Sequence, residues 1–264
     1  MLYRCGVPRS FPQGRAGARD DHPTSRPGPS AHPRAALLLV VVIAVAGNLA
    51  LNLLVPAALY VPAALGTALA AVLAAVAVGG CGARDLGLAP GDLGRGLRFG
   101  GAALAVTAAV LALAAAVPAT RELFADRRVD AASAAALLYV TLVRVPLGTV
   151  ALEETLFRGV ILGLLLRLRR SPWQAAVWSS VLFGLWHVLP ARSLTTFNPV
   201  VAGAGGGTAR GALGIAAGVS GTALAGLVFC WLRLRSRSLL APMLLHVATN
   251  SLGYALAWVV LRAR

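Results

Sequence analysis

The sequence predicts an all-α protein, a polytopic transmembrane helical bundle of about seven spans plus a short extra helix. Of the 264 residues, 58% are hydrophobic and 12% are charged, and the mean hydropathy is +0.77. A water-soluble domain carries roughly 25% charged residues, so half that share indicates a chain embedded in lipid. Runs of about 20 apolar residues, long enough to cross a bilayer as helices, recur along the chain.

The chain divides into a tail and one membrane domain. Residues 1–34 are rich in Pro, Gly, Ser and Arg and lack apolar periodicity, which predicts a disordered tail. Residues 35–262 form the predicted transmembrane domain, whose motif-bearing core covers about 132–262. The predicted spans lie near 35–55, 57–78, 97–118, 146–166, 173–190, 211–232 and 238–261.

A shorter apolar helix is expected at 132–144, ahead of the fourth span. A single helix over 132–166 would measure roughly 50 Å, too long for a hydrocarbon core of about 30 Å without strong tilt. Proline lacks the backbone N–H and clashes with the preceding turn, so Pro146 is the expected break. Arg144 would then lie near a membrane interface.

The distribution of positive charge predicts the orientation. All 24 basic residues are arginines, and the formal net charge is +15. They gather in the tail and in the turns 81–98, 167–171 and 233–238. Positive residues prefer the cytoplasm, so we expect a multi-pass protein of the cell membrane with a cytoplasmic N-terminus. Nucleic acid is not an expected partner, because the arginines lie at helix ends rather than on one face.

Polar side chains interrupt three of the apolar runs. In "EETLFR" (153–158), Arg158 follows Glu154 by four residues, the spacing that places two side chains on one helix face. Glu154 is therefore expected to be held by Arg158. Glu153 is rotated by about 100° from Glu154, so its partner must come from another helix, or it must be protonated.

The other two motifs supply candidate partners for Glu153. His187 ends "FGLWH" (183–187), and His246 and Asn250 lie four residues apart on one face in "HVATN" (246–250). Glu153 and His187 lie at similar distances along their helices from the basic turn that joins the two helices. The sequence predicts that the acids share a water-filled site with both histidines and Asn250.

Each motif also has a purely structural interpretation. A Glu–Arg pair can clasp one helix, and an intramembrane histidine or asparagine often joins helices by hydrogen bonds. The joint occurrence of three such motifs on three helices favours a site. Other polar, aromatic and cysteine residues are expected only to join or pack helices or to be incidental: Asn48, Asn52, Trp178, Trp186, Trp258, Cys5, Cys81 and Cys230.

At these residues the chain resembles the CAAX prenyl endopeptidase and bacteriocin-processing family, also called the Abi family of intramembrane proteases. The family pattern is Glu-Glu-x-x-x-Arg, then Phe-x-x-x-His, then His-x-x-x-Asn/Asp, and the three motifs occur here in that order. The resemblance covers about residues 90–262. It implies hydrolysis of a peptide bond near the membrane plane, in CAAX-type or bacteriocin and peptide processing. The implied partners are a peptide or prenylated-protein substrate and the lipid bilayer.

Two mechanisms remain open. In a metal-free form, Glu153 is the base that takes a proton from water, His187 orients that water, and His246 and Asn250 donate hydrogen bonds to the oxyanion. In a zinc form, Glu153, His187 and His246 are the two-histidine, one-carboxylate ligands of an open catalytic site. The expected cofactor is thus either none or zinc. Asn250 beside His246 favours the metal-free form.

Two other functional classes compete with the protease. An ion- or proton-coupled transporter also buries Glu and His, but it predicts inverted repeats and broken helices in both halves, which the sequence lacks. A non-catalytic scaffold would use the polar groups only to hold helices together. The predicted depths also leave open which membrane face the cavity meets, because His246 lies closer to its basic turn than Glu153 does.

Overall fold

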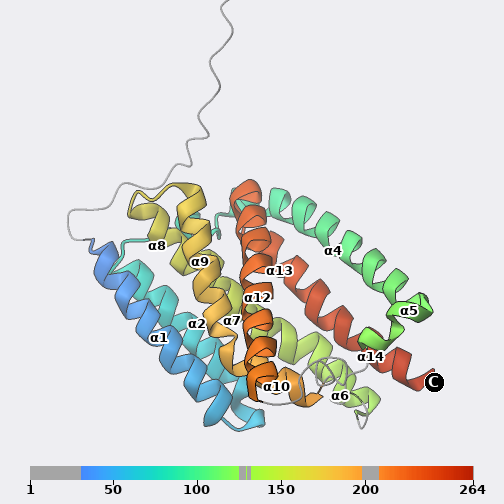
Figure 1. Cartoon of the computed structure of the whole chain (residues 1–264). Helices are drawn as coiled ribbons and strands as arrows, with labels where there is room; N and C mark the ends of the chain where they lie inside the picture. Colours follow the sequence, from blue (N-terminus) through green and yellow to red (C-terminus); the bar gives the residue numbers. More distant parts are fainter. Residues whose placement is uncertain (1–30, 125–128, 130–131, 198–207, 264) are drawn as a thin grey trace, which may run out of the picture.

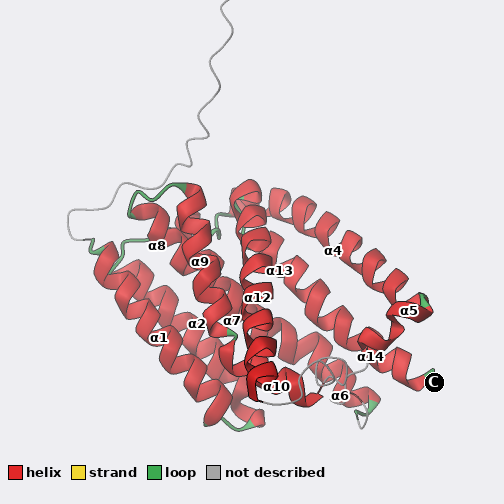
Figure 2. Ribbon diagram, viewed as in Figure 1, coloured by secondary structure: helices red, strands yellow, loops and turns green. Residues whose placement is uncertain are grey.

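The computed structural model describes residues 31–124, 129, 132–197 and 208–263, and these form a bundle of helices without a strand (Figures 1 and 2). The predicted tail over 1–34 lies outside the described residues up to position 30. The first helix begins at Pro33, within two residues of the predicted boundary. The all-α transmembrane fold predicted from composition is confirmed.

The first half of the bundle is built from three long helices and short connecting pieces. The elements are α1 (Pro33–Leu53), η1 (Ala57–Leu59), α2 (Tyr60–Ala77), α3 (Ala83–Leu86), η2 (Pro90–Asp92), α4 (Leu93–Ala116), α5 (Pro118–Arg121) and η3 (Glu122–Phe124). The second half carries the motifs. Its elements are α6 (Ala134–Tyr139), η5 (Val140–Val150), α7 (Ala151–Glu154), η6 (Thr155–Ile161), α8 (Leu162–Arg167), α9 (Pro172–Trp186), α10 (Val188–Phe197), α12 (Thr208–Ser236), α13 (Leu240–Val247), η7 (Ala248–Leu252) and α14 (Gly253–Arg262).

Six helical stretches in the described residues are long and apolar enough to cross a membrane. They correspond to the predicted spans except the one near 173–190. That segment is α9, of 15 residues, followed after a turn at His187 by α10, of 10 residues. The helix is interrupted there because the His187 N–H bonds to the carbonyl of Gly184, at 2.9 Å, in a tighter turn.

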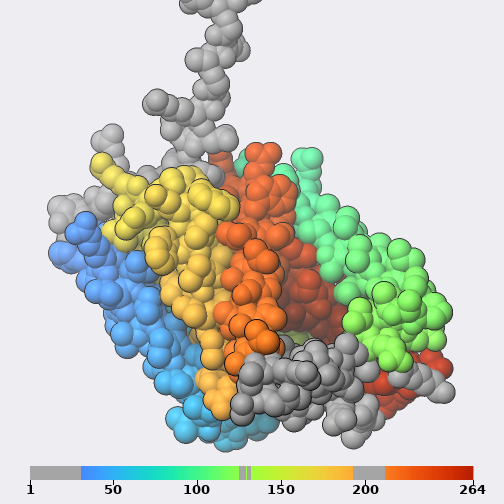
Figure 3. Space-filling view, viewed as in Figure 1, coloured from blue at the N-terminus to red at the C-terminus, as the bar shows by residue number. Residues whose placement is uncertain are grey.

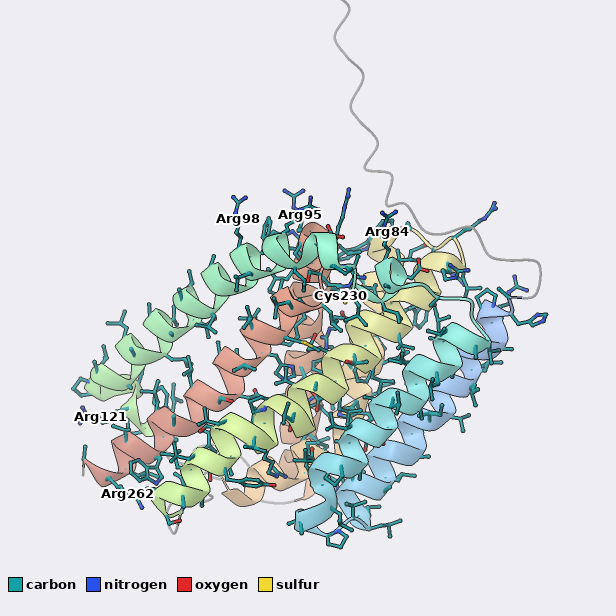
Figure 4. The ribbon with its side chains drawn as sticks, turned by 180° about the vertical axis from the view of Figure 1, so that it is seen from behind. Arg84, Arg95, Arg98, Arg121, Cys230 and Arg262 are labelled. Atoms are coloured by element: carbon teal, nitrogen blue, oxygen red, sulfur yellow. The ribbon has the colours of Figure 1, made fainter. Side chains whose placement is uncertain are left out.

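The expected break at Pro146 is wrong. Helical structure continues over 34 residues from Ala134 to Arg167. Pro146 lies inside η5, a π-helical segment, whose wider turn with i→i+5 bonding accommodates a residue that cannot donate to the α-helical ladder. The long helix runs obliquely through the bundle (Figure 4), and tilt is how a helix longer than the membrane is thick fits within it.

Three π-helical segments adjoin the motif residues. The four-residue helix α7, which ends in Glu153 and Glu154, lies between η5 and η6. His246 is the last residue but one of α13, and η7 begins two residues after it, at Ala248. Because π-segments re-aim side chains and are frequent at functional sites, they mark where the regular helical register is adjusted for the buried polar groups.

The arginine-bearing turns lie together at one end of the bundle. Figure 4 shows Arg84, Arg95 and Arg98 at this end and Arg121 and Arg262 at the opposite one. The start of α1, the connection from α2 to α4, the connection from α8 to α9 and that from α12 to α13 all lie at the first end (Figure 1). This clustering agrees with the charge pattern from which a cytoplasmic N-terminus is predicted.

Small residues let the helices around the motifs approach closely. The buried face of α2 is a stripe of alanines, Ala64, Ala68, Ala71 and Ala75, the kind of surface that allows backbone contact between membrane helices. Packing on either side places α7 and η6 in the interior, with α1 and α2 on one side and α9 and α12 on the other. On the face seen in Figure 3, α13 forms the floor of a hollow between α12 and α4.

Candidate active site

Glu154 and Arg158 form a fully buried ion pair. Nη1 of Arg158 lies 3.1 Å from Oε1 of Glu154, and both side chains are 0% exposed. The guanidinium lies over the ring of Phe183, at 3.9 Å from its centroid, and of Phe229, at 4.8 Å. The predicted four-residue pair is therefore confirmed, and aromatic faces contribute a further cation–π attraction to the same guanidinium.

His246 joins this pair from another helix. Its Nδ1 lies 2.8 Å from the same Oε1 of Glu154, and its ring stacks on Phe229 with centroids 5.0 Å apart. A carboxylate beside an arginine accepts hydrogen bonds, so Nδ1 carries a hydrogen and donates a hydrogen bond to Glu154. The other ring nitrogen, Nε2, is thereby turned towards Glu153.

Glu153 lies at the meeting point of three helices. Its Oε1 accepts a hydrogen bond from the indole N–H of Trp186, at 3.1 Å. Its Oε2 is 3.8 Å from Nε2 of His187 and 3.8 Å from Nε2 of His246. The prediction that the partners of Glu153 come from other helices is confirmed.

His187 is fixed by the helix end that it terminates. Its Nδ1 lies 2.8 Å from the backbone carbonyl of Phe183. A carbonyl can only accept, so Nδ1 is the protonated nitrogen, and Nε2 of the neutral ring carries a lone pair. The side chain is 18% exposed, against 8% for Glu153 and 5% for His246, so His187 is the most open member of the cluster.

The arrangement presents one unsatisfied oxygen to two imidazoles. Oε2 of Glu153 is buried without a hydrogen-bond partner, and 3.8 Å is beyond direct hydrogen-bond distance. A water molecule, which has two donors and two acceptors, can bridge acceptors at such a separation. The geometry therefore suits a water held between Glu153 and the histidines.

Zinc fits this donor set in chemistry but not in arrangement. One carboxylate and two imidazoles are ligands that catalytic zinc takes, and bonds of about 2.0–2.1 Å in a tetrahedral site place ligand atoms about 3.4 Å apart. The Oε2–Nε2 separations of 3.8 Å are wider. Within the described residues, no group of three or more His, Cys, Asp or Glu side chains is placed so that it could hold a metal ion.

Asn250 is the predicted site residue that the structure does not join to the others. It lies exposed in η7, and its Oδ1 accepts a long hydrogen bond of 3.4 Å from Thr249. Among the hydrogen bonds of the described residues, none links Asn250 to Glu153, His187 or His246. Its part in the site stays a prediction.

Two residues expected only to pack or join helices contact the cluster. Trp186 donates to Glu153, and its own backbone carbonyl accepts a hydrogen bond of 2.8 Å from Asn48 of α1. A buried indole N–H needs an acceptor, and Trp186 directly precedes a motif histidine. That combination is the sequence signal that could have placed Trp186 in the site.

An apolar cavity of about 260 Å³ adjoins the site. It lies between α1, η6 and α9, and its lining includes Asn48, Phe157, Leu185 and Trp186. Trp186 faces this cavity and also bonds to Glu153, so one side chain contacts both the apolar space and the polar cluster.

Comparison with known proteins gives one family. Residues 133–252 match the family model described as type II CAAX prenyl endopeptidase Rce1-like. This range contains all three motifs and every residue of the cluster except Asn48. No curated protein and no solved structure matches the chain.

Proposed function

We propose that the protein is an intramembrane endopeptidase in which Glu153 activates water. The part of the chain that carries the three motifs matches the model of the type II CAAX prenyl endopeptidase Rce1-like family, and this match supports the proposal. The observation that carries the proposal is the approach of Oε2 of Glu153 to two imidazoles, at 3.8 Å each. Water is a poor nucleophile, and a positioned base is what it needs in order to attack an amide.

The reaction follows from the hydrogen-bond roles. Glu153 takes one proton from the bridging water while the water oxygen bonds to the carbonyl carbon, and the carbonyl oxygen becomes an oxyanion. His187, through the lone pair on Nε2, accepts a hydrogen bond from the other O–H of the water and so orients the water; that hydrogen stays on the oxygen that is added to the carbonyl carbon. The C–N bond then breaks, and Glu153 returns its proton to the departing amine.

His246 is suited to stabilising the oxyanion. In its imidazolium form it donates from Nδ1 to Glu154, at 2.8 Å, and from Nε2 into the site. The contact with Arg158, at 3.1 Å, holds the Glu154 carboxylate in this orientation. Donors aimed at the oxyanion are commonly among the largest contributions to catalysis, and Asn250 is the predicted second donor.

The apolar cavity beside Trp186 supports a substrate that carries a lipid chain. Its volume of about 260 Å³ and its lining of aliphatic and aromatic residues favour an isoprenoid or similar hydrocarbon over a polar side chain. A plain peptide, as in bacteriocin processing, is the alternative substrate, and only an apolar side chain of such a peptide would fill this cavity.

The test is cleavage by the purified full-length chain in liposomes. Farnesylated and unmodified forms of one CAAX peptide are incubated with wild type and with Glu153→Gln, and mass spectrometry maps the cut. We expect a cut in the farnesylated peptide that Glu153→Gln slows by about 100-fold or more, the usual contribution of a general base. Equal cleavage by the variant would refute the role of Glu153, and equal cleavage of both peptides would refute the lipid preference.

Metal dependence is tested in the same preparation. The proposed reaction needs no metal, so a chelator series is expected to leave turnover unchanged. Loss of turnover with chelator and recovery with added zinc would instead support the zinc form with Glu153, His187 and His246 as ligands.

A further inference from the structure

A second and larger cavity opens at the arginine-bearing end of the bundle. It has a volume of about 550 Å³ and lies between the segment 83–92, α8 and the end of α12. Its lining residues on α8 are Gly163 and Leu166, nine and twelve residues beyond Glu154, or roughly 14–18 Å along a helix. The cavity shares no lining residue with the catalytic cluster.

Three arginines line this cavity: Arg84, Arg233 and Arg237. Its two acidic lining residues are paired with arginines outside the lining. Asp85 forms a buried ion pair of 3.0 Å with Arg167, and Asp92 pairs with Arg95 at 3.2 Å. The lining therefore keeps an excess of positive charge.

Arg233 is built into the wall rather than free at its surface. It is 5% exposed, and its Nη2 donates to the backbone carbonyls of Arg84, at 3.2 Å, and Asp85, at 3.0 Å. Its Nε is buried without a hydrogen-bond partner. Two carbonyls orient the guanidinium but do not cancel its charge.

The backbone is shaped around this guanidinium. Gly87 has φ +75°, and a Cβ at this position would collide with Nε and Cζ of Arg233. Only glycine takes up this conformation and this close approach without strain. Arg237, in the turn before α13, itself has φ +57°, a backbone state that is rare and costly for a residue with a side chain.

We propose that this cavity binds a phosphate group, and that the phosphate is the headgroup of an acidic phospholipid. Guanidinium groups match the oxygens of phosphate through paired N–H donors. A volume of 550 Å³ lies within the range of small-molecule sites. Arg84, one of the lining arginines, lies at the end of the bundle where the basic turns gather (Figure 4), and arginines near a membrane surface attract anionic lipid. The proposal is independent of peptide hydrolysis.

The experiment measures lipid retained by the purified full-length chain. Wild type is equilibrated in mixed micelles with equal amounts of phosphatidylglycerol and phosphatidylcholine, and bound lipid is counted by native mass spectrometry. The test variant is Arg84→Gln with Arg237→Gln, both of which are exposed positions. Arg98→Gln is the matched control, because Arg98 is exposed at the same end but does not line the cavity.

We expect phosphatidylglycerol to be retained in preference to phosphatidylcholine, and the double variant, which loses two arginines that line the cavity, to lose at least about fivefold in retention, or about 1 kcal/mol. Arg98→Gln should change retention by less than twofold. An equal loss in the control, or no preference between the lipids, would overturn the proposal.

A parallel arm with inorganic phosphate distinguishes a lipid headgroup from free phosphate as the ligand. If phosphate binds alone and displaces the lipid at millimolar concentration, the lipid assignment is wrong. Arg233→Gln is a second variant, and it should also reduce the retention of phosphatidylglycerol.

Discussion

Replacing Arg158 by methionine removes one half of the buried ion pair while keeping a chain of similar length. The guanidinium is 0% exposed and lies 3.1 Å from Glu154. After the substitution the Glu154 carboxylate remains buried, with Nδ1 of His246 at 2.8 Å as its remaining partner. The aromatic faces of Phe183 and Phe229 also lose the cation above them.

The expected cost follows from that unpaired charge. Removing one partner of a buried pair costs about 3–5 kcal/mol, whereas replacing both by apolar residues is often close to neutral. We therefore expect Arg158→Met to lower the free energy of unfolding by about 3–5 kcal/mol. Arg158→Met combined with Glu154→Leu should recover a large part of that loss, because the orphaned carboxylate is gone.

The assay is reversible unfolding in mixed micelles with increasing dodecyl sulfate, followed by circular dichroism. Arg98→Gln, at an exposed position, is the control and should change the free energy by about 0.5 kcal/mol or less. Two outcomes would refute this reasoning. The first is a loss of unfolding free energy below about 1 kcal/mol for Arg158→Met. The second is additivity, in which the double variant is less stable than Arg158→Met by the whole loss that Glu154→Leu causes alone.

Three further predictions concern the site, the packing and a buried thiol. Trp186→Phe keeps an aromatic ring but removes the indole N–H that donates to Glu153, 3.1 Å away. Because a hydrogen bond to a charged group contributes about 1.5–3 kcal/mol, turnover should fall about 10- to 100-fold. A Cβ at Gly100 would lie 2.8 Å from the backbone of α13, whereas one at Gly101 meets nothing within 4 Å. Gly100→Ala should therefore lower the free energy of unfolding by about 1–3 kcal/mol, whereas Gly101→Ala should raise it slightly through helix propensity. Burial, with a further contribution from a nearby aspartate, raises the pKa of Cys81 from 9.0 to about 11, so the neutral thiol persists at pH 8. The thiolate fraction is then about 100-fold lower than for a free cysteine, and maleimide labelling at Cys81 should be slow until the protein is denatured or the pH approaches 11.

Each of these has a control within the chain. Trp178, exposed on the same helix as Trp186, should tolerate phenylalanine without loss of turnover, and a shared loss would mean that general packing explains both. Equal unfolding free energies for the two alanine variants would contradict close contact between α4 and α13. Labelling of Cys81 in the native protein at the rate of an exposed thiol would contradict its burial.

The spacing of residues along the sequence predicted the features that lie within a single helix. The Glu154–Arg158 pair follows from four-residue periodicity, and the membrane helices follow from run length and hydropathy, because both depend on residues near in sequence. The convergence of Glu153 with His187 required an added assumption, that the fourth and fifth spans form a hairpin level at their shared basic turn. The structure bears out that assumption with the 3.8 Å separation.

Other features depend on contacts that spacing does not encode. Pro146 is compatible with a continuous helix because η5 adopts a π-helical turn, a choice made by tertiary packing rather than by proline alone. Trp186 reaches Glu153 because α9 packs against η6, and nothing in an apolar helix reveals which way one indole N–H points. The exposure of Asn250 likewise depends on η7, where the helix departs from 3.6 residues per turn.

The central claim, that Glu153 and His187 act on one water molecule, is tested most directly by a double-mutant cycle on turnover. The rates of Glu153→Gln, His187→Gln and the double variant are measured with one peptide in one liposome preparation, with unfolding monitored for each. When two residues act as a unit, removing either one abolishes the contribution of both to the rate. The turnover rate of the double variant should therefore lie within about threefold of that of the slower single variant. If the two losses multiply instead, the side chains act independently and the shared water does not exist.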